Sequence, residues 1–179
     1  MSGTNGGFAR YAEIRKNYKY YQEIKNRIDL YSPGESILDV GPGGTDVIYT
    51  GEFAKRTVVN RDRMNVEYPG VEVIIGDWLT TEIGPHEVVT CCQVIEHIPN
   101  AQVHEFTAKL LATATRSLII SVPFSWPPGT CKTHFQDPID REKLARIMGQ
   151  EPDHTELVRD GAWRLVAEYS ADGLECGQR

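Results

Sequence analysis

The sequence contains no long hydrophobic run and no apolar N-terminal core of the kind that signal peptides carry. A helix that crosses a bilayer needs about 20 consecutive, mostly apolar residues, and a secretory signal needs a shorter apolar stretch behind a few basic residues. Neither pattern occurs in the 179 residues. We therefore expect a cytoplasmic protein without a membrane-spanning segment.

Cysteine is scarce, and its spacing is irregular. The four cysteines, Cys91, Cys92, Cys131 and Cys176, form no C-x-x-C pair. Zinc knuckles and disulfide-rich domains place their cysteines in close, repeated pairs. The sequence therefore predicts reduced thiols without a zinc-knuckle or disulfide framework.

Basic residues are also in the minority. Nineteen Lys and Arg stand against 25 Asp and Glu, which gives a net charge of −6. Proteins that bind nucleic acids in general need positive charge to neutralise phosphates. The charge balance argues against that function class.

The chain is long enough for one domain with a substantial core and too short for two of ordinary size, at 179 residues and 40% hydrophobic. Residues 1–8 are small, polar and glycine-rich, so we expect a flexible leader there. The remainder, 9–179, should form a single domain. Within it we expect an N-terminal helix at 9–31 with a tyrosine-rich apolar face, a core at 36–169 and a tail at 170–179.

Short apolar runs alternate along the chain with segments of helical character. Runs of this kind, bounded by glycine, proline or polar residues, are typical of strands; they lie at 37–40, 57–60, 72–75, 87–91, 117–122, 155–158 and 163–169. Helices are expected at 46–53, 101–112 and 141–148. This alternation predicts an α/β fold: a doubly wound, mostly parallel seven-stranded sheet with helices on both faces. Asp160-Gly161 is a hairpin signal, so the sheet should end in a C-terminal antiparallel hairpin.

The stretch at residues 36–46, SILDVGPGGTD, is the part of the sequence that most clearly indicates a ligand site. A buried strand containing Asp39 leads directly into a turn with Gly41 and Gly43, where backbone can approach a ligand closely. A dinucleotide-binding G-x-G-x-x-G fingerprint would need glycine at position 46, which is Asp46. The chain instead matches a pattern of an acidic residue followed by G-x-G, formed by Asp39, Gly41 and Gly43.

Four segments in order resemble the motifs of the class I S-adenosylmethionine-dependent methyltransferases: ILDVGPGG, VVNRD, VIIGDW and HEVVTCCQVIEHIP. The resemblance extends over residues 36–169. It implies S-adenosylmethionine (SAM) as the cofactor, S-adenosylhomocysteine (SAH) as its product, and methyl transfer to an O, N or C acceptor. The chain lacks the insertions that form acceptor domains in larger relatives, which favours a small-molecule acceptor.

The resemblance also implies where the methionine half of the cofactor would lie. Gly41 and Gly43 would let backbone approach it, and Asp39 would act on its ammonium group through the loop and water. Gln93 would face the region of the methyl group. Asp39 could instead serve only to hold the turn.

The adenosine half would lie against residues that follow the second and third strands. An acid there can accept hydrogen bonds from both ribose hydroxyls; Asp62 is the expected residue, and Asn60 is the alternative. Asp77 would accept from the adenine amino group. Trp78 would cover the adenine face or, alternatively, pack in the core.

The pair Glu96-His97 admits three interpretations. His97 could remove a proton from the acceptor, since the pKa of histidine is ordinarily near neutrality. The pair could instead only begin a helix. The small-RNA 2′-O-methyltransferases have a comparable cation-binding segment, matched here by Glu96, His97 and His134. Gln93 replaces their first Glu, and loss of an anionic ligand weakens a hard-cation site. We take His97 as the catalytic candidate and expect no metal.

The acceptor should bind beneath the N-terminal helix and the loop after the fifth strand, and Tyr18, Trp126 and His134 are the candidate contacts.

Two departures from the family pattern support an alternative, a catalytically silent SAM-binding scaffold. Thr45 replaces the frequent third glycine, and the segment before Asp77 is short. An RNA methyltransferase is a further alternative, suggested by Glu96-His97 and by the basic N-terminal arm, residues 1–30, which holds six Lys and Arg against three Asp and Glu.

Overall fold

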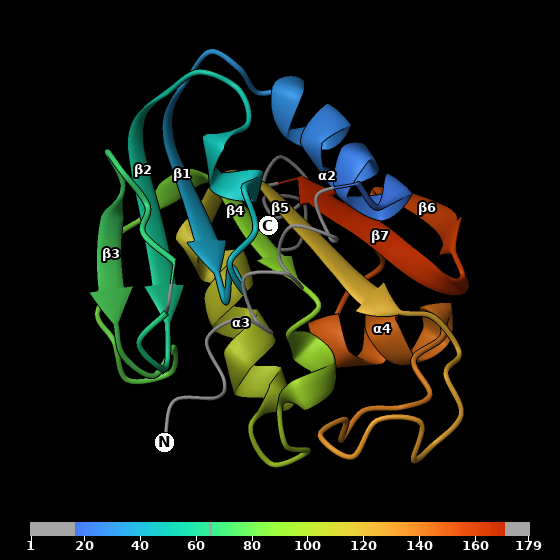
Figure 1. Ribbon diagram of the computed structural model, residues 1–179. Helices are drawn as coiled ribbons and strands as arrows, with labels where there is room; N and C mark the ends of the chain where they lie inside the picture. Colours follow the sequence, from blue (N-terminus) through green and yellow to red (C-terminus); the bar gives the residue numbers. More distant parts are fainter. Residues whose placement is uncertain (1–16, 65, 171–179) are drawn as a thin grey trace, which may run out of the picture.

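The computed structural model describes residues 17–64 and 66–170. The expected leader, the first part of the N-terminal helix and nearly all of the expected tail lie outside these ranges. The described chain forms a seven-stranded sheet in the order β3-β2-β1-β4-β5-β7-β6 (Figure 1). The strands are β1 (Gly34–Val40), β2 (Phe53–Asn60), β3 (Glu72–Ile75), β4 (His86–Cys92), β5 (Ala114–Pro123), β6 (His154–Asp160) and β7 (Ala162–Ser170).

The sheet is mostly parallel, and its C-terminal edge is antiparallel. Strands β1 to β5 pair with their neighbours in parallel, whereas β7 runs antiparallel to both β5 and β6. Asp160 and Ala162 pair across Gly161, whose φ is +71°. These pairings confirm the predicted doubly wound sheet with its closing hairpin.

Helices cover both faces of the sheet. Helix α2 (Lys19–Asp29) lies on one face, and α3 (Val103–Thr113) and α4 (Arg141–Met148) lie on the other (Figure 1). Each face has its own buried cluster: Tyr21, Ile24 and Ile28 of α2 belong to one, and Phe106, Leu110, Leu144 and Ile147 of α3 and α4 belong to the other. Within the described ranges, no helix is long and apolar enough to span a bilayer.

The structure corrects the helix predicted at 46–53. Only a 3₁₀ turn, η1 (Val47–Tyr49), forms there, and Phe53 already begins β2. The β-branched residues at 47 and 48 are weak helix formers. Gly51 has φ +65°, a left-handed conformation that ends any helix. The chain therefore passes from the glycine turn to β2 almost without a helix. The segment between β2 and β3 also has no helix among its described residues.

Helix α2 is attached to the sheet through a buried carboxylate. Glu168 in β7 is 1% exposed. It pairs with Arg27, accepts a hydrogen bond from the Tyr31 hydroxyl and accepts another from Ser117 Oγ at 3.0 Å. A buried charge is tolerated when it is paired and hydrogen-bonded in this way. The network fixes the position of α2 against β5 and β7.

Candidate functional site

The turn after β1 needs glycine at its first position. Gly41 has φ +72°, and its N–H donates to the carbonyl of Val59 in β2 at 2.9 Å. A Cβ built on Gly41 would lie 2.6 Å from Cγ2 of Val94. Both the conformation and the close approach therefore exclude a side chain.

Thr45, which replaces the third glycine of the pattern, fits the turn without strain. The positive φ angles belong to Gly43 and Gly44, at +56° and +80°, and Thr45 does not share them. Thr45 instead donates to the Pro42 carbonyl through its N–H at 3.0 Å and its hydroxyl at 2.9 Å. The missing glycine therefore leaves the turn intact.

The side chain of Tyr68 supports the turn through a hydrogen bond. The buried Tyr68 hydroxyl donates to the Thr45 carbonyl at 3.2 Å. Burial and the nearby negative charge of Asp39 raise the pKa of Tyr68. The phenol therefore keeps its proton and remains a hydrogen-bond donor at neutral pH.

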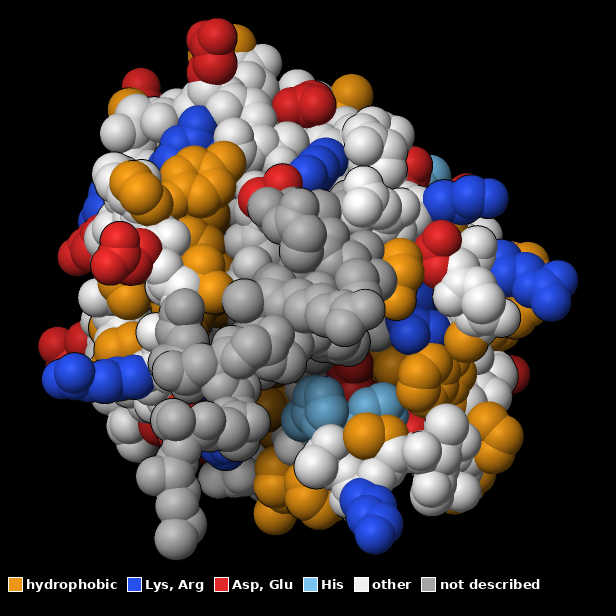
Figure 2. Space-filling view, viewed as in Figure 1, with side chains coloured by type: hydrophobic (Ala, Val, Ile, Leu, Met, Phe, Trp, Pro, Cys, Tyr) orange, Lys and Arg blue, Asp and Glu red, His pale blue; other side chains and the backbone are white. Residues whose placement is uncertain are grey.

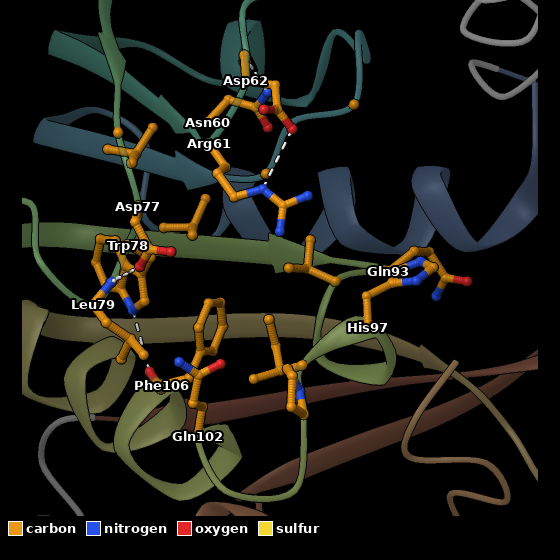
Figure 3. Close-up of a pocket in the computed structure, with 18 of the residues that line it drawn as sticks. Asn60, Arg61, Asp62, Asp77, Trp78, Leu79, Gln93, His97, Gln102 and Phe106 are labelled. Carbon is orange, nitrogen blue, oxygen red and sulfur yellow. Dashed lines mark hydrogen bonds and ion pairs between the residues drawn. The ribbon is translucent and has the colours of Figure 1, made fainter. Parts of the chain in front are cut away.

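A cavity of about 500 Å³ opens beside the turn, at the carboxyl ends of β1, β2, β3 and β4 (Figure 3). This size is typical of sites for small molecules and cofactors, and α/β sheets place such sites at this edge. Its wall includes Gly41, Gly43, Asn60, Arg61, Asp62, Asp77, Trp78, Gln93, Val94, His97, Ile98, Gln102, Phe106 and Phe135.

Asn60 and Asp62 both line the cavity. Asn60 is the last residue of β2, and its Nδ2 donates to the Asp62 carbonyl at 2.7 Å. The Asp62 carboxylate is 77% exposed and lies 3.3 Å from Arg61 Nε. The choice of Asp62 over Asn60 as the ribose ligand stays a prediction.

Asp77 and Trp78 form one end of the cavity (Figure 3). Asp77 Oδ1 accepts a hydrogen bond from the Leu79 N–H at 2.9 Å. Trp78 is 5% exposed, its Nε1 donates to the Phe106 carbonyl at 3.2 Å, and Lys109 Nζ lies 4.8 Å from its ring centre. Trp78 therefore both packs in the core and forms part of the wall.

Gln93 and His97 lie at the opposite end (Figure 3). Gln93 has φ +58°, which is uncommon for a residue other than glycine. Ser121 in β5 fixes it: the Gln93 N–H donates to the Ser121 carbonyl at 2.8 Å and Nε2 donates to Ser121 Oγ at 3.2 Å. Strained backbone held by its surroundings in this way tends to cluster at functional sites.

His97 is exposed and is held by the loop after β5. Its Nδ1 lies 3.0 Å from the Thr133 carbonyl, and its ring meets the edge of the His134 ring with centroids 4.7 Å apart. Figure 2 shows histidine side chains gathered on this face beside hydrophobic and acidic ones. The Thr133 carbonyl can only accept a hydrogen bond, so Nδ1 carries a proton, and Nε2 is the basic nitrogen of the neutral ring.

No family model matches the chain, and no curated protein matches it in sequence. Solved structures do match, at low identity. The 1,6-didemethyltoxoflavin-N1-methyltransferase of Burkholderia thailandensis, with SAH bound, aligns with a TM-score of 0.70 and 15% identity over 92% of this chain and 84% of that one. The chain has the class I methyltransferase fold.

Two further structures show the same methyltransferase fold. The N-methyltransferase NodS of Bradyrhizobium japonicum with SAH bound aligns with a TM-score of 0.67 and 12% identity, over 85% of each chain. Magnesium protoporphyrin IX methyltransferase of Synechocystis with SAM bound aligns with a TM-score of 0.64 and 14% identity, over 92% of this chain and 84% of that one. The structural resemblance therefore extends over most of the chain.

Four residues predicted for the site do not line the cavity of this methyltransferase fold. Asp39 is 1% exposed and accepts a hydrogen bond from Thr90 Oγ1 at 2.8 Å. Tyr18 lies at the start of α2. Trp126 and His134 stack with ring centroids 5.7 Å apart in the loop after β5. The His134 ring contacts His97, which does line the cavity.

Sequence reasoning missed several residues of the wall. They lie in the loop after β2, in the segment from Val94 through the second 3₁₀ turn, η2 (Ile95–His97), to α3, and, for Phe135, in the loop after β5. Only their position could have indicated them, since these segments follow predicted strands whose ends lie at the ligand-binding edge of a methyltransferase fold. The cavity-lining residues missed include Arg61, Val94, Ile98, Gln102, Phe106 and Phe135.

Proposed function

We propose that this chain is a SAM-dependent methyltransferase that methylates an O, N or C atom of a small molecule. One observation carries the proposal. A single cavity is lined by residues from all four segments that resemble methyltransferase motifs, represented by Gly41, Asp62, Asp77 and His97. Segments far apart in sequence thus contribute to one site of suitable size.

The chemistry of the wall fits the parts of SAM in order. The exposed Asp77 carboxylate can accept from the adenine amino group, and Asn60 or Asp62 can accept from ribose hydroxyls. The turn at Gly41 offers backbone without side chains to the methionine end. SAM bound in this order would present its methyl group near Gln93 and His97, which lie at the end of the cavity opposite Asp77 (Figure 3).

SAM, when bound, supplies a methyl group that is already activated by its sulfonium. The protein therefore has to position the acceptor and exclude water, and well-oriented partners can reach effective molarities on the order of 10⁵ M or more. His97 Nε2 would take a proton from an acceptor hydroxyl or ammonium group. An acceptor that carries no such proton would need only positioning.

A small-molecule acceptor is supported by the size of the cavity, about 500 Å³. One of the matching structures holds 1,6-didemethyltoxoflavin, and the name of another specifies magnesium protoporphyrin IX. The net charge of −6 does not favour RNA as the acceptor.

Calorimetric titration with SAM and SAH tests the proposal directly. We expect saturable one-to-one binding of both and no binding of NAD⁺, the control for a dinucleotide site. A binding free energy weaker than about −4 kcal/mol, which corresponds to no saturation at about 1 mM, would refute cofactor binding.

A catalytically silent SAM-binding protein is the second candidate. It is favoured by the single 3₁₀ turn, η1, that stands in place of the helix expected after the glycine turn. An acceptor panel assayed for SAH release separates the two. Turnover that is lost in His97→Ala while SAM binding persists supports the enzyme, and SAM binding without turnover on any acceptor supports the silent protein.

A further inference from the structure

Helices α3 and α4 lie together on the face of the sheet opposite α2 (Figure 1), and a second cavity opens between them. Its volume is about 530 Å³, which is within the range typical of small-molecule sites. Among the described residues, none lines both this cavity and the first one. A ligand here would therefore bind apart from the proposed SAM site.

A buried hydrogen bond joins the two helices. Thr107 Oγ1 of α3 donates to the Ile147 carbonyl of α4 at 2.9 Å. Val103, the first residue of α3, and Ile147 are both buried, and both line the second cavity. Part of its wall is therefore apolar and is held in place by the contact between the helices.

Two cations line the second cavity from α4. Lys143 and Arg146 are three residues apart, which places them on the same face of the helix. Lys143 Nζ donates to the Gln136 carbonyl, and its two other N–H groups remain for a ligand. Arg146 lies 3.9 Å from Glu142, and both side chains are mostly exposed, so this ion pair is weak. Both cations are therefore available to a ligand.

The opposite side of the second cavity adds further hydrogen-bond donors. Gln136 Nε2 donates to Asn100 Oδ1 at 2.9 Å, so the side-chain oxygen of Asn100 is engaged and its Nδ2 remains a donor. His104 Nδ1 donates to the Ile147 carbonyl at 3.2 Å, and its Nε2 becomes a donor when the ring is charged. His104 also lies in the first turn of α3, where the helix dipole is positive.

Positive charge gathers at the second cavity although the chain as a whole is acidic. Among the described residues of its wall none is acidic, whereas the whole chain has a net charge of −6. Asp140, at the start of α4, is engaged, since its Oδ1 accepts from the Lys143 backbone N–H at 2.8 Å. Cations and N–H donors without a carboxylate among them favour an anionic ligand.

We propose that the second cavity binds a small molecule that carries a phosphate group beside an apolar part. Arg146 and Lys143 would hold the phosphate oxygens through charge-assisted hydrogen bonds, and Asn100 Nδ2 would add a third donor. The apolar part would lie against Val103 and Ile147. A phosphate ion alone would fill only part of the cavity, so the ligand should extend beyond this group.

The test is a calorimetric titration of the full chain with phenyl phosphate at constant ionic strength. We expect one saturable equivalent, and no binding of phenol, which has the same ring without the charge. Arg146→Ala should weaken binding by about 10- to 100-fold, the usual effect of removing a charged hydrogen-bond partner. Arg141→Ala is the matched control, because Arg141 is an exposed residue of the same helix that does not line the cavity. This variant should bind as the wild type does.

Absence of saturable binding, or equal binding of phenol, would overturn the inference. Equal losses in Arg146→Ala and Arg141→Ala would do so too, because they would indicate attraction by net charge alone. Competition with saturating SAH would also overturn it, since the ligand would then lie in the first cavity. Urea unfolding checks that both variants fold. SAM titration keeps the two proposals separate, because SAM binding without phenyl phosphate binding refutes only the second cavity's role, and the reverse refutes only the cofactor site.

Discussion

Replacement of Gly41 by alanine tests the structural account of the turn after β1. Gly41 has φ +72°, and a Cβ there would lie 2.6 Å from Val94 Cγ2. The left-handed conformation costs a residue with a side chain about 1–2 kcal/mol, and overpacking costs about 1–3 kcal/mol more. We expect Gly41→Ala to lower the free energy of unfolding by roughly 2–5 kcal/mol.

Gly70 provides the matched control. It also has φ +72°, but a Cβ there meets no atom within 4 Å. Gly70→Ala should therefore show only the conformational cost, about 1–2 kcal/mol. Removal of the clashing methyl groups by Val94→Ala should restore part of the Gly41→Ala loss, so the double variant should be more stable than the sum of the singles by roughly 1–3 kcal/mol.

Urea unfolding followed by tryptophan fluorescence measures all four proteins. Equal losses in Gly41→Ala and Gly70→Ala would contradict the proposed clash. A coupling energy between positions 41 and 94 within about 0.5 kcal/mol of zero would also contradict the clash, because the stability changes of independent sites are additive within about that value. In the same variants SAM affinity should fall for Gly41→Ala and stay unchanged for Gly70→Ala, since Gly41 lines the cavity.

Three further perturbations test the site and the core. Asp62→Ala should weaken SAM binding in calorimetry by roughly 1.5–3 kcal/mol through loss of a charged acceptor; a larger loss in Asn60→Ala would move the ribose contact to the end of β2. His97→Ala should lower kcat by about 10²- to 10⁴-fold with SAM affinity kept, and a fall in affinity alone would reassign His97 to cofactor binding. Burial lowers the pKa of His86 below its ordinary value of 6.5, so folding favours the neutral form of its ring. The free energy of unfolding should be highest above about pH 6.5 and should decrease as the pH falls below that value. His86→Gln should make this pH dependence, measured by urea unfolding, less steep, and an unchanged slope would refute the role given to His86.

The succession of strands and helices along the chain, and the edge of the sheet that carries the cavity, were predictable because they depend on local patterns. Apolar runs bounded by turn residues mark buried strands, and parallel strands bring their carboxyl ends to one edge. The bounds of β3, Glu72–Ile75, and of α4, Arg141–Met148, agree with the prediction residue for residue. The helix predicted at 46–53 failed because a left-handed glycine at 51 outweighs the pattern before it.

The tertiary structure decided which residues of the site meet. The sequence predicted that Asp39 acts through the loop and water, and the structure adds that its buried carboxylate accepts a hydrogen bond from Thr90 of the neighbouring strand. The meeting of His97 with His134 depends on how the proline-rich loop after β5 returns to η2, and the backbone bonds to Glu96 set that path.

The sequence by itself determined the αβ alternation, the glycine turn and the acids that follow the strands, since these features arise from interactions between residues near one another in the chain. Only the tertiary structure decided the contents of the cavity wall and the joining of η2 to the loop after β5. Those contacts link residues that are distant in sequence, and their free energy depends on the packing of the whole sheet.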